Sequence, residues 1–238
     1  MTTPGMVFGG FLQRRISWVC AVLVLAAVWW WQLRAMQESR ELMWLALTAL
    51  SVLSGFAALG WLRPARVGIT APQAMLLLGT LGMLCGLTWD TRGVGLEALA
   101  SLCAVRAPDW VGLARLHLEW LPAMHAGMIA GGFAALVLLR RVRQGCRRQI
   151  CARVAQNFAC SAWMLAGMSA GVALYYRLAP LLGGSGASAM LGGMIGGMIW
   201  GMVVSVALYR LYCGLYSAAW SVRTRSLPAR ANPSPAKN

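Results

Sequence analysis

Residues 187–208 read ASAMLGGMIGGMIWGMVVSVAL and contain no charged side chain. A run of this length matches a bilayer's hydrocarbon core, which takes about 20 helical residues to cross. No water reaches that core to satisfy backbone polar groups, so a continuous apolar run must be helical there. The strands of a membrane barrel would instead alternate over about ten residues. The stretch therefore predicts a transmembrane helix.

The same pattern occurs five more times earlier in the chain. The six predicted spans cover approximately residues 16–33, 42–62, 74–89, 121–139, 158–176 and 187–208. The third span is short for a membrane helix, so we expect it to include some flanking residues. The expected fold is an all-α integral membrane protein, in which residues 1–238 form one six-helix transmembrane bundle.

The composition supports the same class of protein. Hydrophobic residues make up 59% of the chain and charged residues 11%, whereas a soluble domain is about half apolar and a quarter charged. The net charge of +15 would suggest nucleic acid as a partner of a soluble protein. Here the excess lies beside membrane spans, where anionic lipid headgroups are the nearer partner. We therefore expect the lipid bilayer, and no nucleic acid, as a partner.

The distribution of charge predicts the orientation. All acidic residues fall in odd-numbered connections between the predicted spans: Glu38, Glu41, Asp90, Glu97, Asp109 and Glu119. Of the 21 Lys and Arg residues, 6 share that side and the other 15 lie on the opposite side. Because basic residues concentrate on the cytoplasmic side, we expect both termini in the cytoplasm of a multi-pass protein in a bacterial-type inner (plasma) membrane.

The connection between the third and fourth spans, residues 90–120, is the only outer segment long enough to fold by itself. Leu96, Leu99 and Leu102 recur there at helical spacing, and Asp109 is a suitable N-cap for a second helical piece. Neither piece is long enough to span the bilayer. We predict an outer loop of one or two amphipathic helices lying on the membrane surface.

Two basic segments are predicted on the cytoplasmic side. The connection after the fourth span contains arginines without any acidic residue, which favours contact with lipid headgroups or with an acidic partner. These residues are Arg140, Arg141, Arg143, Arg147, Arg148 and Arg153. The tail, residues 221–238, is rich in proline and arginine, and we expect a disordered basic cytoplasmic segment.

The pentapeptide Gly-Met-x-x-Gly occurs five times in the last four spans. Its glycines are Gly82, Gly86, Gly127, Gly131, Gly167, Gly171, Gly193, Gly197 and Gly201. Each repeat is a GxxxG unit, which lets helix backbones approach closely in lipid. We expect these four helices to pack tightly, which leaves the first two for contact with other membrane subunits or a second copy of the chain.

The methionines of these helices have two interpretations. Met190, Met194, Met198 and Met202 are each four residues apart and therefore line one helix face. Flexible thioethers could simply fill the gaps that glycines leave between helices. Alternatively, a column of soft sulfur ligands could carry Cu(I).

The entrance to the fourth span contains both histidines of the chain. The candidate metal ligands there are His117, Met124, His125 and Met128. An ionisable group inside a membrane is expensive to bury and therefore suggests function. Candidate gating or charge partners are Asp90, Glu119 and Arg177. The alternatives are a neutral His125 bonded to a backbone carbonyl, a His/Met metal site, and a proton relay.

No catalytic motif indicates an enzyme: the sequence contains no Gly-x-Ser-x-Gly elbow, no phosphate loop and no HExxH. Two functions therefore remain as hypotheses. The chain is a non-enzymatic subunit or assembly factor of a membrane complex, or it handles or transports a copper-like transition metal. In the second case copper is the expected bound ion.

Overall fold

The computed structural model describes residues 5–35, 42–62, 69–106, 109–142, 150–182 and 186–225. The chain divides into two compact units, Met1–Val206 and Ala207–Asn238. All contacts discussed below belong to the first unit. The predicted basic connection has no described side chains at its six arginines, and residues 226–238 of the predicted tail also lie outside the described part.

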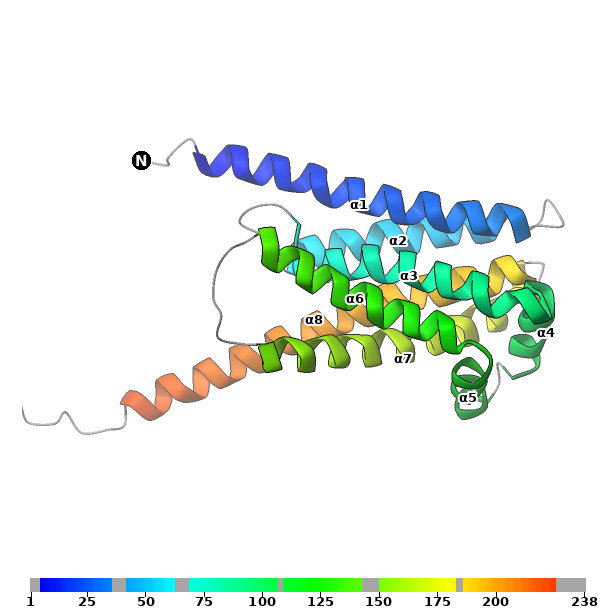
Figure 1. The fold of residues 1–238 in the computed structure, drawn as a ribbon. Coiled ribbons are helices and arrows are strands. Elements are labelled where there is room, and N and C mark those ends of the chain that lie inside the picture. Colours follow the sequence, from blue (N-terminus) through cyan, green and yellow to red (C-terminus); the bar gives the residue numbers. More distant parts are fainter. Residues whose placement is uncertain are drawn as a thin grey trace, which may run out of the picture. The chain divides into compact units, whose positions relative to one another are not determined.

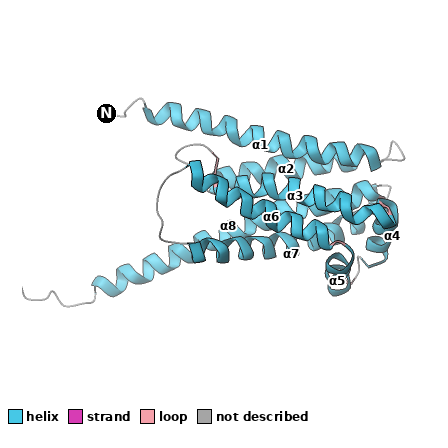
Figure 2. Cartoon of the chain, in the orientation of Figure 1, coloured by secondary structure: helices cyan, strands magenta, loops and turns pink. Residues whose placement is uncertain are grey.

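The described residues form helices and no strand (Figure 2). The elements are α1 (Gly5–Ala35), α2 (Leu42–Leu62), α3 (Ala71–Val94), α4 (Leu96–Arg106), α5 (Trp110–Trp120), α6 (Pro122–Val142), α7 (Ile150–Leu182) and α8 (Ala187–Arg225). Figure 1 shows α4 and α5 together at one end of the first unit. The last turns of α8, residues 207–225, form the described part of the second unit.

Six of the helices are long and apolar enough to cross a membrane. The qualifying stretches are Trp18–Ala35, Leu42–Leu62, Ala71–Val94, Pro122–Leu139, Asn157–Ala179 and Ala187–Leu215. The prediction of an all-helical protein with six such helices is confirmed. The chain is thus a multi-pass membrane protein, with α4 and α5 as two short helices between the third and fourth long ones.

The third long helix extends beyond the predicted 74–89 at both ends. At its start, Thr70 and Gln73 form a capping box, in which the Thr70 side chain accepts from the Gln73 N–H at 3.4 Å and the Gln73 side chain accepts from the Thr70 N–H at 3.1 Å. At its end, Gly95 has a φ of 78° and stops the helix. Polar residues that suggested loop are therefore part of the helix ends.

Glycines bring α3 and α6 into backbone contact. A side chain on Gly82 would collide with the carbonyl of Gly127, and one on Gly127 would collide with the carbonyl of Gly82. The same relation joins Gly86 to Ala123 and Gly131 to Leu78. The two helices thus meet along three consecutive turns, and this contact fixes where α6 begins beside the end of α3.

A second set of glycines lies between α7 and α8. A side chain on Gly167 would collide with the carbonyl of Gly197, and one on Gly171 with that of Gly193. Gly201 faces the backbone of Trp163 in the same way. These contacts set α7 and α8 in one register along their length.

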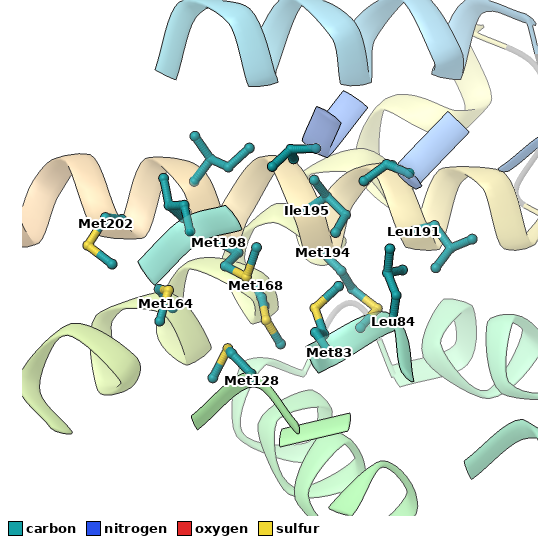
Figure 3. Packing of buried hydrophobic residues seen from close by; sticks show 14 of the residues in the cluster. Met83, Leu84, Met128, Met164, Met168, Leu191, Met194, Ile195, Met198 and Met202 are labelled. Carbon is teal, nitrogen blue, oxygen red and sulfur yellow. The ribbon is translucent and has the colours of Figure 1, made fainter. Parts of the chain in front are cut away.

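Methionines fill the interior between these helices. Figure 3 shows the yellow sulfurs of Met83, Met128, Met168 and Met198 gathered in one region. These residues belong to α3, α6, α7 and α8, respectively. The buried methionines, each at most 1% exposed, are Met75, Met83, Met124, Met128, Met164, Met168, Met190, Met194, Met198 and Met202. The core of this membrane protein therefore contains many soft thioethers among its aliphatic side chains, and α2 contributes Val52 and Phe56 to it.

Candidate functional site

The two histidines come together at the end of the first unit that carries α4 and α5. Asp109 caps α5 by accepting from the Val111 N–H at 3.2 Å. Leu121 ends α5, and Pro122 begins α6 directly afterwards, where a proline costs no hydrogen bond. This break puts His117 and Met124 on different helices, so their seven-residue spacing does not place them on one helix face.

His117 is fully buried and has one hydrogen-bonded nitrogen. Its Nε2 lies 3.9 Å from the Sγ of Cys103 on α4. Its Nδ1 has no hydrogen-bond partner among the described residues. Donation from Nε2–H to the sulfur would leave the lone pair of Nδ1 free inside the protein.

His125 is 7% exposed, and of its two ring nitrogens Nδ1 is paired and Nε2 is not, the reverse of His117. Its Nδ1 lies 2.7 Å from the backbone oxygen of Leu121. Since a carbonyl can only accept, Nδ1 must carry the proton, and the lone pair is on Nε2. That Nε2 is buried and has no partner in the described part of the chain. Sequence reasoning considered this carbonyl bond, but not the nitrogen that it leaves unpaired.

The rings of His117 and His125 are 6.4 Å apart between centroids, with their planes at 43°. Met124 and Met128 follow on α6 and are buried at 0% and 1% exposure. All four predicted ligands are thus buried, and the two rings are neighbours.

The three predicted charge partners have different environments. Asp90 on α3 accepts from the N–H groups of Ala123 at 3.2 Å and Met124 at 2.8 Å, and so caps the start of α6. Glu119 forms an exposed ion pair with Arg115 at 2.7 Å, and Arg177 is exposed. Of the three, only Asp90 is tied to the helix that carries His125.

Replacing Asp90 with alanine should destabilise the protein by about 1–2 kcal/mol, because two N–H groups in the first turn of α6 lose their acceptor. Unfolding in detergent measures the effect. Asp90→Asn keeps one acceptor oxygen and should therefore lose less stability than Asp90→Ala. Asp109→Ala, at an exposed cap, is the matched control and should lose less than Asp90→Ala. Wild-type stability in Asp90→Ala would show that the cap contributes nothing.

Burial keeps the groups beside α5 neutral. Desolvation, with a smaller contribution from His125, lowers the pKa of His117 to about 4. Desolvation likewise raises the pKa of the Cys103 thiol to about 12. A neutral imidazole is the form of histidine that accepts a Lewis acid, whereas a buried imidazolium would repel one.

The lowered pKa of His117 predicts that the metal-free protein, kept in chelator, is less stable at acidic pH. The unfolded chain takes up this proton near pH 6.5 and the folded chain only near pH 4. Above about pH 6.5 the titration of His117 does not lower the free energy of unfolding. As the pH drops from there toward 4, the free energy of unfolding falls by about 1.4 kcal/mol per pH unit. Unfolding of His117→Gln should lack this slope. Equal slopes in both proteins would contradict the buried neutral state.

Cys103 is the neighbour of the histidines that sequence reasoning missed. It lies 14 residues before His117 on a different helix, so only the tertiary fold brings the two together. The Tyr176 hydroxyl of α7 donates to the Ala100 carbonyl at 2.7 Å and helps hold α4 in place. The available signal was a cysteine within the connection between the third and fourth predicted spans, residues 90–120.

Among the described residues, no three side chains of His, Cys, Asp and Glu are arranged to hold one metal ion. A four-ligand zinc site of the usual kind is therefore not built from those groups in the described part.

Fold and site together define a multi-pass helical membrane protein with a buried, partly unpaired pair of histidines above a methionine-lined interior. No known protein family, curated protein or solved structure matches the chain.

Proposed function

We propose that this membrane protein handles a soft transition-metal ion, Cu(I), bound between His117 and His125. The observation that carries the proposal is the pair of buried imidazole nitrogens without partners, one on each ring. Leaving such a group unpaired costs about 1–3 kcal/mol. A metal ion accepts both lone pairs and removes that cost.

The second nitrogen of each ring supports the same function. Metal-bound histidines almost always donate their other N–H to a carbonyl, carboxylate or water. Here Nδ1 of His125 faces the Leu121 oxygen, and Nε2 of His117 faces the Cys103 sulfur. The Leu121 carbonyl fixes the tautomer of His125, and donation from Nε2–H of His117 to the Cys103 sulfur would give His117 a free Nδ1 for the metal.

The spacing of the rings suits an ion between them. Two metal–nitrogen bonds of about 2 Å, with the ring radii added, place the two ring centres about 6 Å apart. The centroids are 6.4 Å apart. Cu(I) tolerates low coordination numbers and prefers soft ligands, which the buried thioethers of Met124 and Met128 can supply.

A competition titration tests the proposal. The metal-free protein in mild detergent is titrated with Cu(I) held by a chromophoric chelator, and separately with Zn²⁺. We expect saturable Cu(I) binding that withstands the chelator, with much weaker Zn²⁺ binding. Failure to take Cu(I) from the chelator would refute the function.

A second candidate is a non-enzymatic subunit or assembly factor of a membrane complex. It is favoured by a groove of about 500 Å³ on α2, α7 and α8. The small residues Ala166 and Ala170 line the groove, and the exposed rings of Trp163 and Trp200 lie beside them. Small residues let a transmembrane helix of a partner subunit approach closely.

A larger side chain in the groove tests the subunit function separately from metal binding. If a partner helix occupies it, Ala170→Leu should abolish co-purification of the partner and leave Cu(I) binding unchanged. Leu174→Ala, which removes bulk from the groove edge, is the control and should keep the partner. Isolation of the chain alone from native membranes would contradict the subunit role.

A further inference from the structure

A row of sulfur-bearing side chains on α7 leads away from the histidines. Cys160, Met164 and Met168 are four residues apart and therefore lie one above another on one helix face. Both methionines are 0% exposed and Cys160 is 5% exposed. Helices α6 and α7 run in opposite directions, so Cys160, which is nearest the start of α7, lies far from the end of the unit that carries α4 and α5 (Figure 1).

Helix α8 places further ligands beside this row. A side chain on Gly201 would come within 3.3 Å of the Met164 Cα, so Gly201 and the following Met202 lie level with Met164. Figure 3 shows the Met164 and Met202 sulfurs on neighbouring helices. One turn further on, the Ser205 hydroxyl lies 3.6 Å from the Cys160 sulfur. Two thioethers, and then a thiol with a hydroxyl, thus occur on successive turns of α7 and α8.

Unpaired polar atoms lie next to Cys160. Asn157 is 0% exposed, and neither its amide oxygen nor its amide nitrogen has a hydrogen-bond partner in the described residues. The same holds for the hydroxyl of Ser161, which is 4% exposed. Asn157 precedes Cys160 by three residues and Ser161 by four, so they share a face. Its Oδ1 lies 2.9 Å from where a Gly132 side chain would begin.

These atoms require an explanation. Each unpaired buried polar group costs about 1–3 kcal/mol, and Asn and Ser side chains in a membrane helix ordinarily hydrogen-bond to a neighbouring helix, which Asn157 and Ser161 do not do in the described residues. Apolar side chains packed around Asn157 would leave its amide group without a hydrogen-bond partner. A bound ion beside Cys160 would give that amide oxygen a partner.

We propose a second Cu(I) site at this end of the interior, with Cys160, Met164 and Met202 as sulfur ligands and the Asn157 amide oxygen as a neighbour. The thiol releases its proton to solvent as the Cu–S bond forms. The resulting Cu(I)–thiolate pair has no net charge, which limits the cost of holding it in the membrane.

This inference rests on the proposed function and extends it to transport. His125 lies in the first turn of α6 and Cys160 in the first half of α7, which runs in the opposite direction (Figure 1). The buried methionines Met168, Met194 and Met198 gather in the interior of the first unit (Figure 3). An ion accepted at the histidines therefore has soft ligands available along its way to a second binding site.

Stoichiometry and vesicle uptake test the second site. The background is a chain with Cys85→Ser, Cys146→Ser, Cys151→Ser and Cys213→Ser, because thiols outside the two proposed sites bind Cu(I) independently. We expect two Cu(I) ions in this background and one in Cys160→Ala. Cu(I) entry into proteoliposomes should fall at least about tenfold in Cys160→Ala. Met164→Leu, which conserves volume, should also slow entry and serves as the folded variant if Cys160→Ala misfolds.

The outcomes separate the two proposals. Loss of one ion in Cys160→Ala and of the other in His117→Ala/His125→Ala supports both sites. A single ion that is lost only in the histidine variant keeps the proposed function and overturns the second site. Two ions in Cys160→Ala, or unchanged entry in both Cys160→Ala and Met164→Leu, also overturn it. No Cu(I) bound at the histidines overturns the proposed function itself.

Discussion

Replacing both His117 and His125 with alanine should lower the affinity for Cu(I) at the histidine site by about ten-thousandfold. Structural zinc sites are worth about 10–16 kcal/mol for four ligands, so one ligand contributes about 3 kcal/mol, or about a hundredfold. The two rings together then contribute about the square of that factor. Chelator competition measures the change in the background with the four Cys→Ser substitutions, to which Cys160→Ala is added to remove the second proposed site.

The single variants and Cys103→Ala sharpen this expectation. Each histidine alone should cost about a hundredfold. Cys103 orients His117 without being required as a ligand, so its loss should cost about 10–100-fold. Glu119→Gln, at an exposed ion pair on the same helix as His117, should leave affinity unchanged. Affinity equal to wild type in the double variant would remove the histidines from the site.

Replacing Gly127 with leucine should prevent α3 and α6 from packing and destabilise the protein by at least about 3 kcal/mol, at the upper end of ordinary overpacking. The new side chain would meet the carbonyl group of Gly82, and backbone cannot swing away. Because native proteins are stable by about 5–15 kcal/mol in total, we expect aggregation or early unfolding in detergent.

Gly60→Leu is the matched control for this substitution. Gly60 lies on α2, and no atom of the described residues comes within 4 Å of a side chain placed there. Its stability should stay within about 0.5 kcal/mol of wild type. Equal stability of the two leucine variants would contradict a close contact between α3 and α6.

The long helices could be predicted because an apolar run of about 20 residues has no other stable form in lipid. The ends were harder. Gln73 and Asp90 suggested the limits of the third span, yet Gln73 completes a capping box and Asp90 caps α6. A polar residue whose partner lies on another element does not interrupt a helix, and sequence alone does not show that partner.

The candidate site, too, could be predicted from the sequence only in part. The clustering of His117 and His125 in sequence made them candidates, because they are the only two histidines of the chain. Cys103 could not be paired with His117 without knowing how α4 folds against α5. Asn157 was missed for a different reason: it sits at the edge of an apolar run and resembles an ordinary interface residue, although it is completely buried.

X-ray absorption at the copper edge of the Cu(I)-loaded protein tests the central claim most directly. The sample is the Cys160→Ala variant in the background with Cys85→Ser, Cys146→Ser, Cys151→Ser and Cys213→Ser, so that only the histidine site is filled. We predict a spectrum with two imidazole nitrogen ligands and thioether sulfur, which reverts to unbound copper in His117→Ala/His125→Ala. A first shell of sulfur alone, unchanged by the histidine substitutions, would contradict a metal site between these two rings.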